Sequence, residues 1–345
     1  MLTARYKKHT LQFRRPAGTS RGTLRSKESW FIFLEDTEHT EKKGVGECSL
    51  LRGLSPDEGN GYEEKLAEVC KNIHKIAPGK LTRWPSIRFG VEMALQDMAV
   101  EHERILFPSP FTRGERSMKI NGLIWMGDKR YMRQQIDNKL EQGFDCLKMK
   151  IGAIDWQSEL SLLQSLRNSY GSKTLELRVD ANGAFSPQEA PAKLEALKKL
   201  HVHSIEQPIK QGTPETMALL CRNTPVAIAL DEELIGIDAC EEKENLINTI
   251  KPQYIILKPG LVGGFESSRE WIDIAERQGA GWWVTSALES NIGLNAIAQW
   301  TYTLGNNMPQ GLGTGQLYSN NISSPLEISQ GHIWYRPQKK WDKNL

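Results

Sequence analysis

The chain has 345 residues, with 44 lysines and arginines against 42 aspartates and glutamates, so its formal net charge is +2. A charge so near zero gives no overall field that favours nucleic acid or an acidic membrane, and no run approaches the ~18 apolar residues of a membrane-spanning helix. The five cysteines form no C-x-x-C pair, and the N-terminus lacks the apolar segment of a signal peptide. We therefore expect a cytoplasmic protein with no nucleic-acid, membrane or obligate protein partner.

The first third of the chain predicts a small antiparallel sheet followed by helices. Alternating apolar residues indicate strands at Leu2 to Arg14, 30–36 and 44–50. Helical periodicity indicates helices at 61–76 and 86–103. The stretch between the first two strands, "RPAGTSRGTLRSK", is rich in Gly, Ser, Thr and Arg, which predicts a mobile loop. Together these elements predict an α+β block of about 115 residues.

From Lys119 onward, short apolar strands alternate with amphipathic helices. The expected strands lie at 118–124, 145–151, 176–181, 203–207, 226–232, 254–258, 281–286 and, more weakly, 307–313. Repeated strand–helix alternation predicts a parallel sheet with right-handed crossovers, and eight such strands predict a TIM-like barrel. The last residues fall outside this rhythm, and we expect them to pack back on the N-terminal block.

Polar side chains stand at the C-terminal ends of these strands, which is where TIM barrels place their catalytic groups. They are Lys148, Lys150, Asp180, Glu206, Asp231 and Lys258. From Lys150 onward they are 25 to 30 residues apart, which is about the length of one strand–helix unit. Residues i and i+2 of a strand share a face, so Lys148 and Lys150 point the same way. We expect the whole set to converge on one mouth of the barrel.

Three carboxylates at one mouth repel one another unless a cation lies between them. Oxygen ligands from Asp180, Glu206 and Asp231 suit Mg²⁺, although Asp180 on its own would more often be a helix cap. Lys150 and Lys258 flank the three carboxylates along the chain. A lysine beside a cation has a lowered pKa and can act as a base, while the metal stabilises an oxyanion. The set therefore favours removal of a proton α to a carboxylate.

Five motifs in order resemble those of the enolase superfamily, in particular its muconate-lactonising subgroup. They read "KMK", "RVDANGAF", "SIEQPI", "IALDEEL" and "ILKPGLVGG". The resemblance covers nearly the whole chain and implies an α/β fold, with a modified TIM barrel, (β/α)7β, at residues 116–315. It further implies an α+β capping domain at residues 1–115 and a C-terminal segment at 316–345 that returns to the cap.

The same resemblance implies roles for the residues that match its motifs. Asp180, Glu206 and Asp231 would bind Mg²⁺, with Mn²⁺ as a substitute. Lys150 would be the general base, and Lys258 would be the second lysine of the pair, on the other side of the substrate. Asn182 and Glu232, which neighbour metal ligands, would support those ligands by hydrogen bonding.

The subgroup hosts o-succinylbenzoate synthases, dipeptide epimerases, N-acylamino acid racemases and cycloisomerases. Its dipeptide epimerases usually carry an acidic D-x-D at the eighth strand, whereas residues 311–315 here read "GLGTG". Strand seven ends in small neutral residues at 285–287, so we expect a substrate that is itself an anionic small molecule. The stretches "RFGVEMALQDMA" and "TSALESNIGLNAIAQW" most resemble the o-succinylbenzoate synthases of menaquinone biosynthesis.

For that activity, the resemblance implies dehydration of 2-succinyl-6-hydroxy-2,4-cyclohexadiene-1-carboxylate to 2-succinylbenzoate. Lys150 would abstract the α-proton and return a proton to the departing hydroxyl group. Lys258 would support the developing negative charge and contact the ring by a cation–π interaction. A dipeptide epimerase or N-acylamino acid racemase is the alternative, since a racemase would use both lysines as acid and base.

Two charged residues of the barrel interior have more than one interpretation. Lys148 shares a face with Lys150, and either holds down its proton affinity, binds a substrate oxygen or forms a structural salt bridge. Arg178 lies two residues before Asp180 and faces the barrel interior. Its guanidinium either balances the carboxylates, which we favour, or reaches an anionic substrate.

The candidate substrate contacts come from strand ends and from loops. They are Ser286, Gly313, Thr314 and Arg25. We expect residues 17–27 to close over the mouth, so that Arg21 and Arg25 meet a substrate carboxylate; the alternative is that both are solvated. Residues 52–55 are a candidate second lid segment. Equally, the small residues of the strand ends make room for the substrate without binding it.

Overall fold

The structure is a computed structural model that describes residues 1–19 and 22–342, so Arg21 lies outside the described residues. Its strands are β1 (Leu2–Thr19), β2 (Gly22–Asp36), β3 (Lys43–Ser49), β4 (Met118–Lys119), β5 (Gly122–Ile124), β6 (Cys146–Lys150), β7 (Glu176–Asp180), β8 (Ser204–Glu206), β9 (Ala227–Leu230), β10 (Tyr254–Leu257), β11 (Gly281–Val284), β12 (Leu326–Ser329) and β13 (His332–Tyr335). Its α-helices are α1 (Tyr62–Lys71), α2 (Pro85–Met98), α3 (Lys129–Glu141), α4 (Trp156–Ser169), α5 (Ala190–Lys199), α6 (Pro214–Asn223), α7 (Cys240–Ile250), α8 (Pro259–Val262), α9 (Gly264–Arg277) and α10 (Asn291–Thr303). Short 3₁₀ helices are η1 (Ile73–Lys75), η2 (Pro78–Lys80) and η3 (Glu232–Leu234).

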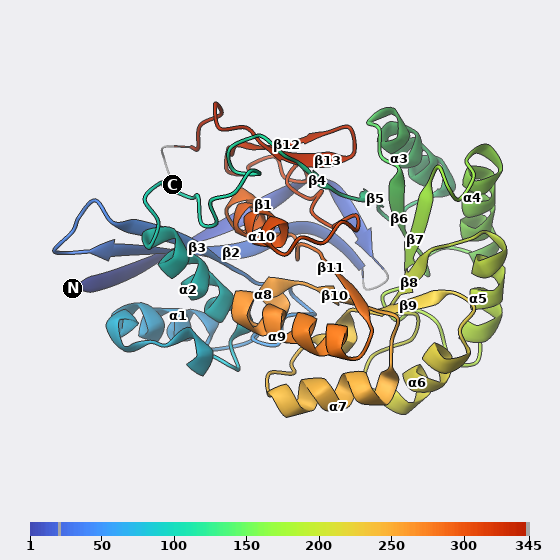
Figure 1. The fold of residues 1–345 in the computed structure, drawn as a ribbon, viewed down its shortest axis with the longest axis horizontal. Helices are drawn as coiled ribbons and strands as arrows, with labels where there is room; N and C mark the ends of the chain where they lie inside the picture. Colours follow the sequence, from blue (N-terminus) through green and yellow to red (C-terminus); the bar gives the residue numbers. More distant parts are fainter. Residues whose placement is uncertain (20–21, 343–345) are drawn as a thin grey trace.

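Strands β1, β2 and β3 form an antiparallel sheet that lies against α1 and α2 at the N-terminal end of the molecule (Figure 1). Side chains alternate along β2 because successive strand residues face opposite ways. Trp30 and Ile32 pack in the hydrophobic core under the helices, whereas Phe31 packs in the larger core that continues into the barrel. Helix α2 approaches β3 closely at Gly46, where a Cβ atom would lie 1.9 Å from the carbonyl oxygen of Gly90.

The prediction of a mobile loop between the first two strands is wrong. Strands β1 and β2 continue as a long hairpin, with Gly18 paired to Thr23 and a register shift between Gln12 and Ala17. Polar composition does not prevent backbone pairing, because the ladder is built from main-chain groups. The hairpin is also anchored by apolar contacts, since Ala17 and Leu24 pack in one small cluster with Trp125 of the barrel.

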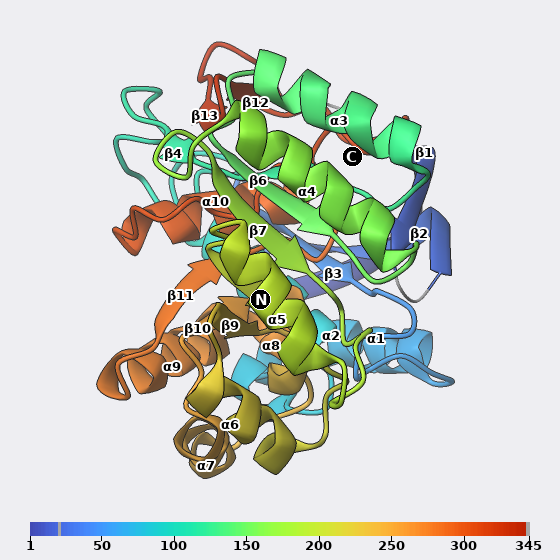
Figure 2. The ribbon, with the colours of Figure 1, turned by 90° about the vertical axis from the view of Figure 1, so that its right-hand side faces the viewer.

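Seven parallel strands form the barrel sheet, in the order β11-β10-β9-β8-β7-β6-β5. A helix follows each strand, and Figure 2 shows α3 to α7 packed along the outside of the curled sheet. The weakly predicted eighth strand is reduced to two parallel bridges, from Gln310 to Ile120 and from Gly311 to Thr285. These bridges join the two ends of the sheet. The fold class is thereby confirmed as α/β with a (β/α)7β barrel.

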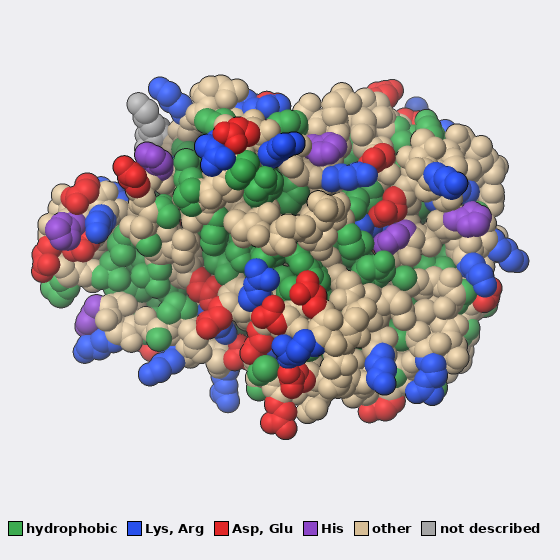
Figure 3. All heavy atoms as spheres, in the orientation of Figure 1, with side chains coloured by type: hydrophobic (Ala, Val, Ile, Leu, Met, Phe, Trp, Pro, Cys, Tyr) green, Lys and Arg blue, Asp and Glu red, His purple; other side chains and the backbone are tan. Residues whose placement is uncertain are grey.

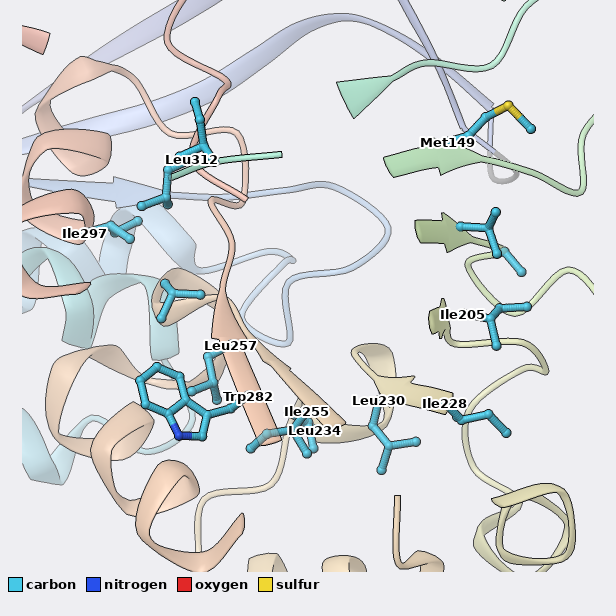
Figure 4. Close-up of a cluster of buried hydrophobic side chains, with 14 of the residues drawn as sticks. Met149, Ile205, Ile228, Leu230, Leu234, Ile255, Leu257, Trp282, Ile297 and Leu312 are labelled. Carbon is cyan, nitrogen blue, oxygen red and sulfur yellow. The ribbon is translucent and has the colours of Figure 1, made fainter. Parts of the chain in front are cut away.

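The barrel core lies between the sheet and its outer helices. Figure 4 shows buried apolar side chains of the barrel strands, including Met149, Ile205, Ile228, Leu230, Ile255 and Leu257. All six are nearly completely buried. Because these positions pack outward, their strand neighbours point into the barrel. The hydrophobic pattern thus fixes which side chains face the interior.

The C-terminal residues run back along the N-terminal hairpin before they form a hairpin of their own. The amide of Arg14 donates to the carbonyl of Leu317 at 2.8 Å, and the amide of Gln12 donates to Asn320 Oδ1 at 2.7 Å. Strand β13 then pairs with β4, so the predicted strand at 118–124 divides into β4 and β5. The C-terminal segment therefore contacts both β1 and the start of the barrel; the predicted domain boundaries stay predictions.

The surface carries charges of both signs. On the face shown in Figure 3, lysines and arginines are interspersed with aspartates and glutamates, in line with the net charge of +2. Among the described helices, we find none that combines the length and the apolar character needed to cross a membrane.

Candidate active site

Neighbouring barrel strands bring the predicted lysines and carboxylates together. Lys150 on β6 is the register partner of Asp180 on β7, and Asp180 is the partner of Glu206 on β8. Asp231 and Lys258 follow directly after β9 and β10. Parallel strands end at the same edge of a sheet, so these side chains meet at the C-terminal mouth of the barrel. The structure thus assembles the whole set that the spacing predicts.

Each carboxylate of the cluster is paired with a lysine. Lys150 Nζ donates to Asp180 Oδ2 at 2.7 Å, and Lys148 Nζ donates to Glu206 Oε2 at 2.6 Å. Lys258 donates to Asp231 Oδ2, and its Nζ atom lies 3.6 Å from Glu206 Oε1. The lysine pairs make the cluster internally charge-compensated, which a buried group of ions requires. The salt-bridge interpretation of Lys148 therefore has direct geometric support.

Burial and opposite charge act against each other in this cluster. Burial by itself would raise the pKa of the Glu206 carboxyl, but the charges of Lys148 and Lys258 outweigh it and lower that pKa to about 2. Burial likewise would lower the pKa of Lys148, yet the nearby carboxylates of Glu206 and Asp180 raise it. For Asp231, burial dominates and raises the pKa well above its ordinary value, against the opposing charge of Lys258. The mouth is consequently an electrostatically strong, dry setting.

The carboxylates fit a hard divalent cation by chemistry and by strand position. All three supply oxygen donors on successive strands, which is the ligand type that Mg²⁺ prefers. Glu206 Oε1 is buried and lacks a hydrogen-bond partner within the described part of the chain, so it retains acceptor capacity. In the present side-chain arrangement, however, the described residues include no group of three or more acidic, His or Cys side chains placed to hold one ion. Their role as metal ligands stays a prediction.

A cavity of about 230 Å³ lies above the cluster. Its barrel-side lining includes Lys148, Lys150, Asn182, Lys258, Asn121, Leu123 and Trp125. Its polar lining contains four cationic side chains, three lysines and Arg52, and no aspartate or glutamate from the described residues. Each of these cations is paired with a carboxylate outside the lining, so the lining offers a ligand charged N–H donors with no acidic side chain among them.

The cap closes one side of this cavity. Residues 22–24 of the hairpin and residues 51–54 after β3 line it, so both predicted lid segments reach the mouth. Arg25 is exposed and is not among the residues that line the cavity, whereas Arg52 is. Arg52 also forms ion pairs with Glu28 and, at 3.6 Å, with Glu58. The structure therefore places Arg52, and not Arg25, where a substrate group would bind.

The ends of β11 and of the eighth strand position supply a neutral wall. Ser286 Oγ and Thr314 Oγ1 lie 2.5 Å apart in a hydrogen bond, and both residues line the cavity together with Gly313. Thr285 Oγ1 has no hydrogen-bond partner among the described residues. A Cβ atom at Gly311 would lie 2.3 Å from that oxygen, so the glycine lets the two segments approach. The Ser286 hydroxyl also accepts from the amide of Leu288 at 3.3 Å, so it is held in place by the wall itself.

The residues predicted to support the site divide into two groups. Asn182 accepts from Lys150 Nζ at 2.7 Å and donates to Glu232 Oε1 at 2.9 Å, so it links the candidate base to the segment that follows β9. Asn182 holds a left-handed backbone with φ 45°, a conformation that asparagine tolerates better than most residues. Arg178 lies deeper, where it donates to Glu176 and stacks over Trp283. Arg178 therefore pairs with Glu176 at the start of β7, and neither a site carboxylate nor the cavity lining is among the contacts described for it.

The sequence interpretation did not single out Asn121 and Trp125 of the first barrel strand and its following loop, which also line the cavity. The polar Asn121 within an apolar strand was the available signal. No signal in the sequence marked Trp125 as a cavity residue, because a tryptophan in a hydrophobic stretch is more often part of the core.

The chain is similar to several known proteins. Residues 131–339 match the family model described as Enolase C-terminal domain-like. The o-succinylbenzoate synthase of Desulfotalea psychrophila is 46% identical over 94% of this chain and 97% of its own length. The crystal structure of MenC from Desulfotalea psychrophila LSv54 superposes with a TM-score of 0.86 at 42% identity, covering 96% of this chain and 99% of that chain.

More distant structures share the architecture. The L-Ala-D/L-Glu epimerase of Bacillus subtilis superposes with a TM-score of 0.82 at 20% identity, covering 98% of this chain and 96% of that chain. That degree of identity speaks for the fold alone, because one fold hosts many activities. With the barrel, the strand-end lysines and carboxylates and these matches in agreement, the chain belongs to the enolase superfamily.

Proposed function

We propose that this protein is an o-succinylbenzoate synthase. It would dehydrate 2-succinyl-6-hydroxy-2,4-cyclohexadiene-1-carboxylate to 2-succinylbenzoate in menaquinone biosynthesis. The proposal is supported by 46% identity to such an enzyme over nearly the whole chain. A cytoplasmic location is part of the proposal, in keeping with five cysteines that are all free thiols.

The observation that most supports this function is the set of charged side chains that line the cavity. Three lysines and Arg52 line it without any described acidic side chain, and the substrate of this reaction is a dicarboxylate. The charged N–H groups of this lining are suitable hydrogen-bond donors for the carboxylates of such a substrate. An epimerase substrate with a free ammonium group would find no carboxylate on this lining.

Lys150 is the proposed general base. Its ammonium nitrogen reaches the cavity from the end of β6 and is held by Asp180 and Asn182, each at 2.7 Å. Once unprotonated, the amine can take the proton α to the ring carboxylate, and the same group can return a proton to the departing hydroxyl. Aromatisation of the ring then favours the product. The bond changes balance, since one C–H and one C–O bond break while water and a ring double bond form.

Lys258 is proposed to stabilise charge from the other side. It follows β10, four strands along the sheet from β6, and it lines the same cavity as Lys150. Its ammonium group would support the negative charge that develops when the proton leaves. No proton donation from Lys258 is needed for dehydration.

Asp180, Glu206 and Asp231 are the proposed ligands of Mg²⁺, with Mn²⁺ as a substitute. A bound divalent cation would offset the charge on the substrate carboxylate. Calorimetric titration with Mg²⁺ tests this apart from activity: the wild-type protein should bind one ion, and Asp231→Asn should bind it at least tenfold more weakly. Equal affinity for both proteins would reject Asp231 as a ligand.

A second function, epimerase or racemase, is favoured by one observation. Lys150 and Lys258 both line the cavity, so the pair can act as acid and base on the two faces of an α-carbon. Racemisation of N-acylamino acids is therefore the alternative or accompanying activity.

One assay separates the two functions. Purified protein with Mg²⁺ and the cyclohexadiene substrate should show loss of the substrate's absorbance. In parallel, N-succinylamino acids and L-Ala-L-Glu are incubated in deuterium oxide, and exchange at the α-carbon is followed by NMR. Turnover of the cyclohexadiene supports the synthase. Exchange without any dehydration would overturn it in favour of the racemase or epimerase.

A further inference from the structure

A buried polar network that is separate from the lysine cluster joins the cap to the barrel. We call it the Glu47 network, and it consists of Lys27, Ser29, Glu47, Ser49 and Ser290. All five side chains are almost fully buried. Four of them belong to the cap strands β2 and β3, whereas Ser290 precedes α10 of the barrel. The network therefore crosses the interface between the two parts of the fold.

Glu47 is the centre of this network because its carboxylate accepts four hydrogen bonds. Oε1 accepts from Ser29 Oγ at 2.6 Å and from the amide of Ser290 at 2.9 Å. Oε2 accepts from Ser290 Oγ at 2.6 Å and from the amide of Gly293 at 2.9 Å. Two of these donors are amides at the start of α10, where an anion is electrostatically favoured. A carboxylate of the cap thus caps a helix of the barrel.

Lys27 supplies the balancing positive charge. Its ammonium group donates to Ser49 Oγ and, at 3.4 Å, to Ser29 Oγ. Ser29 in turn donates to Glu47, so its hydroxyl bridges the ammonium group of Lys27 and the carboxylate. A buried ion of either sign needs such compensation.

Three walls of the cavity begin at this network. Lys27 lies three residues after Leu24 of the hairpin wall, and Ser49 lies two residues before Leu51 of the second cap segment. Ser290 lies two residues after Leu288 of the barrel wall. The two cap walls are already joined by the β2–β3 ladder, in which Ser29 pairs with Ser49. The network adds the direct connection from these cap walls to the barrel wall.

The barrel wall needs such a connection. Leu288 has a left-handed backbone with φ 63°, which is strained for a residue with a Cβ. Its carbonyl accepts a hydrogen bond from Tyr318 Oη at 2.7 Å, and the following segment is held by the bonds of Ser290 to Glu47. Strained backbone persists only where its surroundings determine it.

We propose that Glu47 is a positioning residue that sets the width of the substrate cavity by fixing these three walls to one another. It does not line the cavity and would act only through the segments it holds. The proposal rests on the proposed function for its kinetic consequence, because the cavity must be the substrate site. Loss of the network should loosen all three walls together and weaken substrate binding more than chemistry.

Glu47→Gln is the sharpest test. The glutamine has the same shape, but one of the two carboxylate oxygens becomes an NH₂ group. That group would face two of the four donors whose hydrogen bonds Glu47 now accepts. We expect KM to rise about tenfold, the equivalent of one lost hydrogen bond to a charged group, with a much smaller change in kcat. Hydrogen–deuterium exchange should increase at residues 22–24, 51–54 and 286–290 together.

Arg88→Gln is the matched control. Arg88 on α2 forms another buried cap–barrel link, to Asp238 at 3.0 Å and to Glu266 at 2.9 Å, but it does not line the cavity. This variant should lose stability without raising KM or exchange in the three walls. If Arg88→Gln raises KM as much as Glu47→Gln, a general loosening of the interface explains the effect and the proposal falls.

The outcomes separate the two proposals. If wild-type protein fails to turn over the cyclohexadiene but Glu47→Gln raises exchange in all three walls, the function is wrong and the network stands. Turnover by wild type with unchanged KM and exchange in Glu47→Gln overturns the network. If Glu47→Gln does not fold, Ser290→Ala, which removes one of the four hydrogen bonds, serves in its place. KM and exchange in the three walls should rise in this variant as well, by smaller amounts.

Discussion

Lys150 Nζ lies 2.7 Å from Asp180 Oδ2, and the two residues are direct register partners on β6 and β7. The candidate base, Lys150, is thereby bonded directly to a candidate metal ligand, Asp180. Because the strands are parallel and adjacent, any shift of one strand would separate the pair by a full residue spacing. The geometry of the catalytic mouth is thus built into the barrel register.

Lys150→Ala should abolish dehydration, because a positioned general base contributes about 10²–10⁴-fold to rate. The measurement is kcat with the cyclohexadiene substrate, supported by circular dichroism to show that the variant folds. Lys173→Ala, at an exposed position, is the matched control and should keep wild-type kinetics. Full activity in Lys150→Ala would remove Lys150 from its proposed role.

Arg52→Ala should raise KM about tenfold, because the lost group is a charged donor that faces the cavity. Arg25→Ala is the control from the neighbouring cap segment, since its side chain is exposed and does not line the cavity. Steady-state kinetics of the two variants decide between the arginines. A large rise in KM for Arg25→Ala with none for Arg52→Ala would restore the expectation drawn from sequence.

Glu289→Gln should stabilise the protein at pH 8 but not at pH 4.5. Burial raises the pKa of Glu289 to about 7, with Lys27 opposing and Glu47 adding to the shift. The folded state therefore holds a proton that the unfolded state has already lost between about pH 4.5 and 7, so stability falls as pH rises through that window. Neither carboxylate oxygen has a hydrogen-bond partner of good geometry among the described residues.

Denaturant unfolding at several pH values checks this linkage. The free energy of unfolding of Glu289→Gln minus that of wild type should grow by about 1–3 kcal/mol between pH 5 and 8. Glu241→Gln, at an exposed position on α7, should show no such growth. A constant difference across the pH range would contradict the raised pKa.

Gly46→Ala should destabilise the cap by about 1–3 kcal/mol or more. The added Cβ would lie 1.9 Å from the Gly90 carbonyl oxygen on α2, which is backbone and cannot turn aside. Gly171→Ala is the control, because a Cβ there meets nothing within 4 Å. Thermal unfolding of both variants tests the close approach of α2 to β3, and equal melting temperatures would count against it.

Much of the barrel followed from local sequence. Alternation of apolar and polar residues on short strands determined which side chains point inward, since the strand repeat is two residues. Regular spacing of Asp180, Glu206 and Asp231 along the chain then indicated one mouth, because each strand–helix unit has nearly the same length. The resemblance of the same motifs to the enolase superfamily agreed with both.

Other features depended on contacts between distant segments. Residues 17–19 and 22–24 have the composition of a loop, yet they pair as strands, and Ala17 and Leu24 pack with Trp125 of the barrel. The choice of Arg52 over Arg25 depends on where the cap rests on the barrel mouth. Neither fact leaves a periodic signal in the chain.

By itself, then, the sequence determined the barrel and its inward-facing charges, because these depend on strand alternation and on repeat length. The family followed from the resemblance of five motifs. Only the tertiary structure decided which lysine pairs with which carboxylate, which cap residues line the cavity, and that Glu47 of β3 meets Ser290 before α10. Those two residues are 243 positions apart. A contact over such a separation is set by packing of the cap on the barrel, and it cannot be predicted from local patterns of apolar and polar residues.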